Sequence, residues 1–416
     1  MARKMKDSGI EWIGEIPEGW EIRKIKNNFM IYAGATPKSE KAEYWDGGIP
    51  WITPADFKTT DKYVSYGRKS LTALGYDSCG TTLVPAGSII FSKRAPVGSV
   101  VIAKNTLCTN QGCLACIPND AVNSTYFYYC MSIFTEQFEL VSAGTTFKEI
   151  AASTFASFLL PCPPLSQQNE IVNFLNKESS RIDSMLSKTR SSIEEYKKLK
   201  QAVITQAVTK GVRGEREMKD SGVEWIGEIN HRFSLIKLKY ICSILDQYRK
   251  PISADKRSQS GSVLYDYYGA SGAIDKIDDY TIDDHVMLIG EDGANLRMRN
   301  LPLMYEVNGK AWINNHAHIL KPTERVDFYY LFYALEELDI NPYITGSAQP
   351  KLSQEKLQNI WVPLPDLEEQ QEIATYIRSK CAEIDKLIAK KEQLVKELER
   401  YKKSLIYEVV TGKWEV

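Results

Sequence analysis

The stretch MKDSGIEWIGEI at residues 5–16 returns as MKDSGVEWIGEI at residues 218–229, with eleven of twelve positions identical. A second repeat, spaced by 202 residues, aligns residues 161–171 with residues 363–373. Its register continues without a gap to residues 209 and 411, and reaches back to Gly144 and Gly346. Repeats of this length indicate a duplicated structural unit. The chain is therefore predicted to contain two copies of one unit, each a globular part followed by a long tail.

The tails are predicted to be helices, because they contain almost no glycine or proline and their apolar residues recur at steps of three, four and seven. About 45 residues would span roughly 68 Å at the helical rise per residue. Asp366 and Glu369 resemble a capping box at the start of the second tail. The predicted seam positions are Ile171, Leu175, Ile182, Met185, Ile193, Tyr196 and Val203 in the first tail, and Ile373, Ile377, Ile384, Leu387, Leu394, Leu398, Tyr401 and Leu405 in the second.

A single amphipathic helix of this length cannot bury its own seam. Because the two seams share one register and length, we expect the tails to pack on each other as an antiparallel coiled coil in a pseudo-two-fold molecule. The alternative is that each tail pairs with a different protein. The expected organisation is a globular domain at residues 1–160, a helix at 161–211, a second globular domain at 212–362 and a second helix at 363–416, with a linker at 211–217.

The globular parts are predicted to be mixed α/β and rich in strands. Residues 88–92 and 99–103 flank a loop beginning Lys93-Arg94, which indicates a hairpin with a basic tip. In the second part, residues 285–289 precede a polar loop. Two apolar segments then flank Asn308-Gly309, a sequence typical of a tight hairpin turn. Short helices are expected at residues 124–141 and 326–338.

Composition restricts the class of protein. No run of about 18 apolar residues predicts a membrane span, and the first residues lead into no signal segment, so we expect a soluble cytoplasmic protein. The net charge of −1 argues against tight DNA binding by phosphate neutralisation alone. It does not exclude binding through local basic loops or with help from partners.

We predict no enzyme activity and no metal site in this chain. Gly309-Lys310 and Gly412-Lys413 lack the upstream glycine and the hydroxyl residue of a phosphate loop. Cys113 and Cys116 have the spacing of a zinc-ligand pair, but there is no second pair, and buried reduced thiols are the simpler interpretation. His316 and His318 place two imidazoles on one face of a strand without further ligands nearby.

The doubled unit, the entries into the tails (PCPPLSQQ at 161–168 and PLPDLEEQ at 363–370) and their exits (AVTKG at 207–211 and VVTGK at 409–413) resemble the DNA specificity subunit of type I restriction–modification systems. The segments IPWITPAD (49–56), TNQG (109–112) and WINNHAHI (312–319) are similar to parts of that family's target-recognition domains. The resemblance covers nearly the whole chain. It implies an α/β (α+β) fold with two target-recognition domains separated by two long helices in an antiparallel coiled coil.

The resemblance also implies a function. Each domain would recognise one half of a bipartite double-stranded DNA site, and the helices would fix the gap between the halves. Two methyltransferase subunits and two restriction subunits would bind the chain, so that S-adenosylmethionine, ATP and magnesium act on those partners and this chain has no cofactor. The rival hypotheses are a coiled-coil adaptor that binds proteins, and a self-contained nuclease or methyltransferase, against which the missing motifs argue.

DNA contacts require amide, hydroxyl or guanidinium groups for base edges and Lys or Arg for phosphates, all on loops. Gly144–Lys148 and Gly346–Lys351 are equivalent by the 202-residue spacing, and form a matched pair of candidate loops. Trp51 and Trp312 are predicted to lie in the core rather than to stack on bases. The candidate DNA-binding residues are Thr36, Lys38, Thr53, Lys58, Lys93, Arg94, Gln111, Thr145 and Lys148 in the first part, and Tyr248, Arg249, Lys250, Asn295, Arg297, Arg299, Gln349 and Lys351 in the second.

Overall fold

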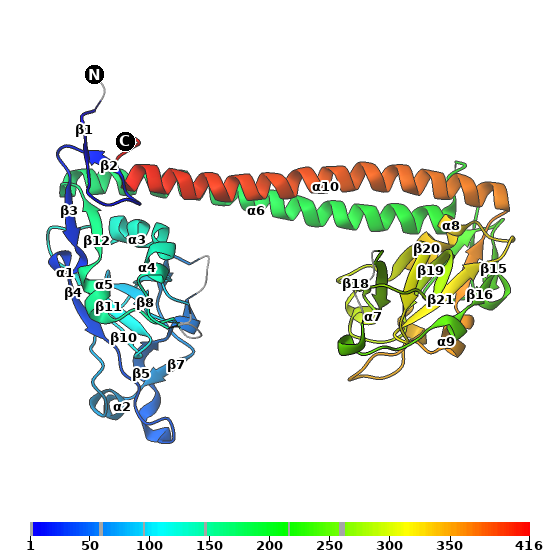
Figure 1. The fold of residues 1–416 in the computed structure, drawn as a ribbon, viewed down its shortest axis with the longest axis horizontal. Coiled ribbons are helices and arrows are strands. Elements are labelled where there is room, and N and C mark those ends of the chain that lie inside the picture. The colour runs from blue at the N-terminus through cyan, green and yellow to red at the C-terminus, as the bar shows by residue number, and fades with distance from the viewer. Residues whose placement is uncertain (1–2, 58–60, 95, 145–147, 215–216, 258–262) are drawn as a thin grey trace. The chain divides into compact units, whose positions relative to one another are not determined.

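The structure is a computed structural model that describes residues 3–57, 61–94, 96–144, 148–214, 217–257 and 263–416. Two compact units divide the chain. Unit 1 combines residues 1–189 with residues 393–416, and unit 2 comprises residues 190–392. Each unit thus contains one globular part, a portion of one long helix and a portion of the other (Figure 1).

Unit 1 begins with a short β-ribbon and contains two larger sheets; in the labels, α is an α-helix, β a strand and η a 3-10 helix. Its elements are β1 (Met5–Asp7), β2 (Glu15–Pro17), β3 (Glu21–Lys24), α1 (Ile25–Asn28), β4 (Phe29–Ala33), η1 (Ala42–Tyr44), β5 (Trp45–Ile52), η2 (Pro54–Asp56), β6 (Tyr63–Val64), β7 (Lys69–Leu71), α2 (Ala73–Asp77), β8 (Ile89–Ser92), β9 (Val100–Ala103), β10 (Cys108–Thr109), β11 (Cys113–Pro118), α3 (Ser124–Ile133), α4 (Thr135–Leu140), α5 (Ala152–Ser157) and β12 (Leu159–Cys162), followed by α6 (Leu165–Lys210), which continues into unit 2. The central sheet has five strands in the order β4-β11-β8-β9-β6, and the smaller sheet has three in the order β10-β5-β7.

Unit 2 repeats this plan with a six-stranded sheet of order β16-β21-β19-β20-β17-β18. Its elements are β13 (Met218–Asp220), β14 (Glu228–Asn230), β15 (Ser234–Lys237), η3 (Leu238–Tyr240), β16 (Cys242–Ile244), η4 (Asp246–Tyr248), η5 (Ala254–Lys256), β17 (Tyr265–Gly269), β18 (Gly272–Ile277), β19 (Ile282–Gly290), α7 (Asn295–Met298), β20 (Met304–Ile313), β21 (Ala317–Pro322), α8 (Phe328–Glu337), η6 (Asn341–Tyr343), α9 (Gln354–Gln358) and β22 (Trp361–Leu364), followed by α10 (Leu367–Val410), which continues into unit 1.

The four strands β4-β11-β8-β9 of unit 1 correspond to β16-β21-β19-β20 of unit 2. In both sheets these neighbours are antiparallel, and the apolar runs of β8 and β19 are buried. One helix follows the last strand of each sheet along the chain, α3 in unit 1 and α8 in unit 2. Asn123 caps α3 and Asp327 caps α8, each through a side-chain oxygen that accepts backbone N–H bonds from the first turn. The same local signal therefore starts the equivalent helix in both units.

The long helices pair with each other in the antiparallel sense, as predicted. In unit 1 the Lys402 ammonium of α10 lies 2.6 Å from a carboxylate oxygen of Asp183 of α6. In unit 2 the Lys200 ammonium of α6 lies 2.8 Å from a carboxylate oxygen of Asp385 of α10. The two helices therefore contact each other in both units, through ion pairs at equivalent positions of the repeat.

The helix seam matches the predicted one at its ends and differs from it in the middle. Equivalent residues enter the two cores: Ile171, Leu175, Val409 and Val410 in unit 1, and Ile373, Ile377, Ala207 and Val208 in unit 2. The prediction was wrong at four positions that are about two-fifths exposed or more, namely Met185, Leu387, Leu394 and Tyr401. Leu186 is buried in place of Met185, because the helix turns this neighbouring side chain toward the partner helix.

Two local predictions need correction. Asn308-Gly309 is no hairpin turn, because β20 runs straight through it and pairs with β19, with His285 opposite Asn308. The nine-residue β19 supplies partners on both sides of the Asn-Gly pair, so the flanking segments do not need each other. The helix expected at 124–141 is two helices, α3 and α4, separated at Phe134. The β8–β9 hairpin and the α8 helix are confirmed.

Candidate nucleic-acid interface

In unit 1 several loops meet at the edge of the central sheet where β4 and β8 end and β11 begins. Backbone hydrogen bonds join them. The Ala35 N–H donates to the Thr109 carbonyl (3.0 Å), the Lys93 N–H to the Gly112 carbonyl (2.9 Å), and the Ile150 N–H to the Lys93 carbonyl (3.0 Å). The loop face of unit 1 is defined as residues 34–38, 93–94, 109–112, 143–144 and 148–150.

Unit 2 builds the same arrangement. The Lys250 N–H donates to the Ile313 carbonyl (2.9 Å), the Glu291 N–H to the His316 carbonyl (2.8 Å), and the Leu352 N–H to the Glu291 carbonyl (2.8 Å). The loop face of unit 2 is defined as residues 246–251, 290–295, 313–316 and 345–352. The two faces thus have a common backbone frame and carry different side chains.

An asparagine turn fixes one loop of each face. The Asn110 side-chain oxygen accepts the Gly112 N–H at 2.9 Å, and the Asn314 side-chain oxygen accepts the His316 N–H at 2.8 Å. Such a bond holds a tight turn without help from neighbouring strands. The segments that resembled target-recognition domains, TNQG and WINNHAHI, therefore contain the same turn in equivalent positions.

The two tryptophans support the loop faces from inside, and their predicted place in the core is confirmed. Trp51 is 6% exposed and Trp312 is 8% exposed. The Trp51 indole N–H donates to the Ala35 carbonyl at 3.0 Å, and the Trp312 indole N–H donates to the Lys250 carbonyl at 2.8 Å. Each indole therefore anchors one loop of its loop face, namely the loop after β4 in unit 1 and the loop after β16 in unit 2.

The structure brings together several of the candidate residues of unit 1. The Thr36 hydroxyl is hydrogen-bonded to the Gln111 side chain, which is exposed. Lys38 and Lys148 are exposed on the loop face. Thr53 is not part of this group, because its hydroxyl and its N–H both donate to the Asp56 carboxylate at η2. The predicted residues Lys58 and Thr145 lie outside the described residues.

Lys93 and Arg94 both face Glu149. The Lys93 ammonium lies 2.7 Å from one carboxylate oxygen of Glu149, and the Arg94 guanidinium lies 3.7 Å from the other. The hydrogen bond from Lys93 holds the pKa of the Glu149 carboxyl below its ordinary value. The predicted basic tip is therefore partly neutralised by an acid that lies 56 residues further along the chain than Lys93.

The candidate residues of unit 2 divide into exposed and internal groups. Tyr248, Lys250 and Gln349 are exposed on the loop face. Arg297 is exposed and donates to the Gly346 carbonyl at 3.3 Å, which links α7 to the loop 345–351. Two others serve internal contacts: Asn295 bonds to the backbone of Leu301 and Pro302, and Arg299 donates to the Glu336 carbonyl.

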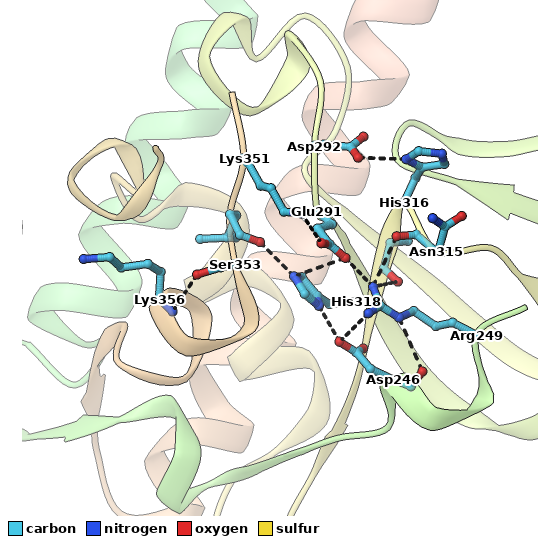
Figure 2. Close-up of polar contacts among 12 residues, drawn as sticks. Asp246, Arg249, Glu291, Asp292, Asn315, His316, His318, Lys351, Ser353 and Lys356 are labelled. Carbon is cyan, nitrogen blue, oxygen red and sulfur yellow. Dashed lines mark hydrogen bonds and ion pairs between the residues drawn. The ribbon is translucent and has the colours of Figure 1, made fainter. Parts of the chain in front are cut away.

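An ionic network underlies the loop face of unit 2 (Figure 2). The Glu291 carboxylate, 14% exposed, contacts the Arg249 guanidinium, and its Oε1 lies 3.1 Å from the Lys351 ammonium. Burial alone would raise the pKa of Glu291, but hydrogen bonds from Arg249 and Lys351 outweigh burial and lower it. Arg249 also lies 3.1 Å from Asp246. The candidate residues Arg249 and Lys351 are thereby joined through one acid.

The two histidines of WINNHAHI have separate partners. His318 is buried between the Asp246 carboxylate, 2.6 Å from its Nδ1, and the Leu352 carbonyl, 2.8 Å from its Nε2. The His316 Nδ1 lies 2.8 Å from the Asp292 carboxylate (Figure 2). These contacts connect the β21 region to three loops. Among the described residues, no group of three or more histidine, cysteine, aspartate or glutamate side chains is placed to hold a metal ion.

Sequence reasoning missed the acids that contact the candidate residues in both units. Glu149, Asp246 and Glu291 were not among the candidates, although each contacts a residue that was. The repeat contained one usable signal, because the 202-residue spacing aligns Glu149 with Lys351.

None of the helices among the described residues combines the length and the apolar composition that crossing a membrane requires.

Comparison with known proteins agrees with this architecture. The family model for the type I restriction modification DNA specificity domain matches residues 17–195 and 231–400. The MjaIX specificity subunit of Methanocaldococcus jannaschii is 40% identical over 167 residues, which cover 39% of each chain. The MjaVIII specificity subunit of the same organism is 24% identical over 96% of this chain and 94% of its own length. A solved structure described as concerning assembly and conformational transition of the type I R-M system matches with a TM-score of 0.75 at 14% identity, covering 96% of this chain and 99% of its own.

Proposed function

Because this chain belongs to the family of type I restriction–modification DNA specificity subunits, we propose that its two loop faces recognise the two halves of a bipartite double-stranded DNA site. One observation carries the proposal: the same backbone frame occurs in both units with different side chains on it. A shared frame would enter the DNA groove in the same way in each unit. The different side chains would then select different bases.

The exposed side chains have the chemistry that this role requires. Amide groups such as those of Gln111 and Gln349 can donate to and accept from base edges. Exposed cations such as Lys38, Lys148 and Lys250 suit phosphate oxygens, which fix the register but carry no sequence information. The net charge of −1 means that these few cations, rather than the whole surface, would supply the electrostatic attraction.

In this proposal the paired helices α6 and α10 set the gap between the half-sites, and the chain acts inside a larger cytoplasmic complex. Two methyltransferase subunits and two restriction subunits are the proposed partners. S-adenosylmethionine, ATP and magnesium would be bound by those partners, and this chain would contribute no catalytic group. A protein-binding adaptor is not favoured, because the chain belongs to a DNA specificity family.

The test is selection from a pool of randomised duplexes by the full chain, alone and with a candidate methyltransferase subunit. We expect the selected duplexes to share two short motifs at a fixed separation. Gln111→Ala should relax one motif and Gln349→Ala the other, since one good bidentate contact discriminates between bases by about 1–3 kcal/mol. Each variant is the matched control of the other. If no duplex is selected either by the chain alone or with the methyltransferase subunit, the chain does not recognise a DNA sequence.

A further inference from the structure

Each unit has an ion pair that joins two loops of its loop face, and the positions of the acid and the cation are exchanged between the units. The loop that contains Glu149 in unit 1, and the one that contains Lys351 in unit 2, is called the later loop. In unit 1 the cation Lys93 follows β8 and the acid Glu149 comes from the later loop, with Nζ and Oε1 2.7 Å apart. In unit 2 the acid Glu291 follows β19 and the cation Lys351 comes from the later loop, with Oε1 and Nζ 3.1 Å apart. These two contacts are called the cross-loop ion pairs.

The backbone shows that the four residues occupy equivalent positions. The Lys93 N–H donates to the Gly112 carbonyl, and the Lys93 carbonyl accepts the Ile150 N–H. In the same way, the Glu291 N–H donates to the His316 carbonyl, and the Glu291 carbonyl accepts the Leu352 N–H. Glu149 exchanges two 3.0 Å hydrogen bonds with Ala143, and Lys351 exchanges two 2.8 Å hydrogen bonds with Thr345. The charge exchange is therefore a difference in side chains on one backbone geometry that both units share.

Burial makes the exchanged charges consequential. The member on the sheet side is the more buried in both units, with side-chain exposures of 17% for Lys93 and 14% for Glu291. Glu149 and Lys351 are 40% and 54% exposed. A like charge placed opposite a largely buried ion costs more than it would on an open surface, because water screens it less.

The geometry points to the cross-loop ion pairs as positioning elements that hold each later loop in place for DNA recognition and make it compatible with its own unit only. This inference rests on the proposed function. It assigns Lys93, Glu149, Glu291 and Lys351 to positioning the loop, and leaves base and phosphate contacts to the exposed residues around them. Moving the loop of one unit into the other would set Lys351 against Lys93, or Glu149 against Glu291.

The experiment compares Glu149→Lys with the double variant Lys93→Glu/Glu149→Lys in the full chain with its methyltransferase partner. The single change should weaken selection at the half-site of unit 1 by at least about fivefold, as expected for coupled neighbouring charges, and the double change should restore it to within about twofold. Glu18→Lys, an exposed site in the turn after β2, makes the same charge change elsewhere on unit 1 and should leave selection unchanged. A gain in general DNA affinity without loss of selectivity, or a double variant as defective as the single one, would overturn the inference.

Unit 2 provides an asymmetric second arm. The second basic neighbour differs between the units: the Arg94 guanidinium lies 3.7 Å from Glu149 and is 40% exposed, whereas the Arg249 guanidinium contacts Glu291 directly and is 17% exposed. Because water screens the repulsion from Arg249 less, Glu291→Lys/Lys351→Glu should not recover the selection that Lys351→Glu loses. Recovery there would contradict the contacts described. The hydrogen-exchange rates of the amides at residues 143–144 and 148–150, measured without DNA, report how firmly the unit 1 loop is held. These rates should rise in Glu149→Lys and fall back to the rates of the unchanged chain in the double variant. If the unchanged chain selects no duplex, the proposed function fails, while the exchange data still decide whether the ion pair positions the loop.

Discussion

Replacing Tyr126 with phenylalanine removes one hydroxyl group from the core of unit 1. That hydroxyl lies 2.9 Å from the Val410 carbonyl and 3.2 Å from the Pro161 carbonyl, and the side chain is fully buried. Val410 is the last residue of α10, so its carbonyl has no partner within the helix. Phenylalanine keeps the packing and leaves this buried acceptor without its donor. The variant therefore isolates the contribution of one hydrogen bond that joins α3 to the end of α10.

Removing the donor from a buried acceptor costs about 1–3 kcal/mol, which corresponds to a rise of about 5- to 150-fold in opening that exposes the affected amides. Tyr330 makes the equivalent contact in unit 2, 2.7 Å from the Pro363 carbonyl and 3.4 Å from the Val208 carbonyl. Native-state hydrogen exchange can follow the end of each helix separately. Tyr126→Phe should speed exchange at residues 405–411. Tyr330→Phe should speed exchange at residues 203–210 to a smaller extent, because the Tyr330 hydroxyl lies closer to the Pro363 carbonyl than to the Val208 carbonyl.

Tyr128→Phe is a matched control, because it makes the same chemical change on the same helix in a partly buried side chain. It should change exchange at residues 405–411 much less than Tyr126→Phe. Unchanged exchange at residues 405–411 in Tyr126→Phe, or an equally strong acceleration at residues 203–210, would refute the role given to this hydrogen bond.

Three further outcomes are expected. Gly412→Ala should destabilise unit 1 by at least about 1–2 kcal/mol in chemical denaturation, because φ is +73° at Gly412 and an added Cβ would lie 2.4 Å from Pro17. In the control Gly80→Ala the added Cβ would meet nothing within 4 Å, so stability should hardly change. Burial raises the pKa of Glu337 to about 7. The folded state therefore keeps a proton that the unfolded chain releases above its ordinary pKa of 4.5, so stability falls as pH rises through this window, and Glu337→Gln should raise the unfolding midpoint at pH 8 but not at pH 4. Lys148→Ala should lower the slope of log affinity against log salt by about 1 without changing the selected sequence, and an altered sequence would show that Lys148 contacts bases.

Sequence reasoning predicted the duplicated architecture because the relevant signals are local and repeated. The repeated segments at residues 5–16 and 218–229, together with the matching tails, indicated two units. The spacing of apolar residues in the tails indicated two long helices. The same reasoning failed at Asn308-Gly309, since a turn signal cannot reveal that β19 lies beside both flanking segments. It also placed Met185 in the seam in place of Leu186, because neighbouring apolar residues on a helix are distinguished only by the partner they meet.

The candidate interface was only partly accessible to sequence reasoning. The repeat correctly paired the later loops of the two units by position, which the structure supports through the equivalent bonds of Glu149 and Lys351. It could not show that Lys93 faces an acid or that Arg299 turns toward Glu336, because these contacts join residues 56 and 37 positions apart. Side chains that bind each other across such distances leave no periodic pattern in either segment.

The division of unit 1 between residues 1–189 and 393–416 has a consequence for biosynthesis. During translation, the polypeptide of unit 2 is finished while unit 1 still lacks the segment that places Leu405 and Val409 in its core. A ribosome-bound nascent chain would therefore leave apolar side chains uncovered on its earliest-made portion until the last turns of α10 emerge. Chaperone contact during synthesis should accordingly concentrate on the portion made first.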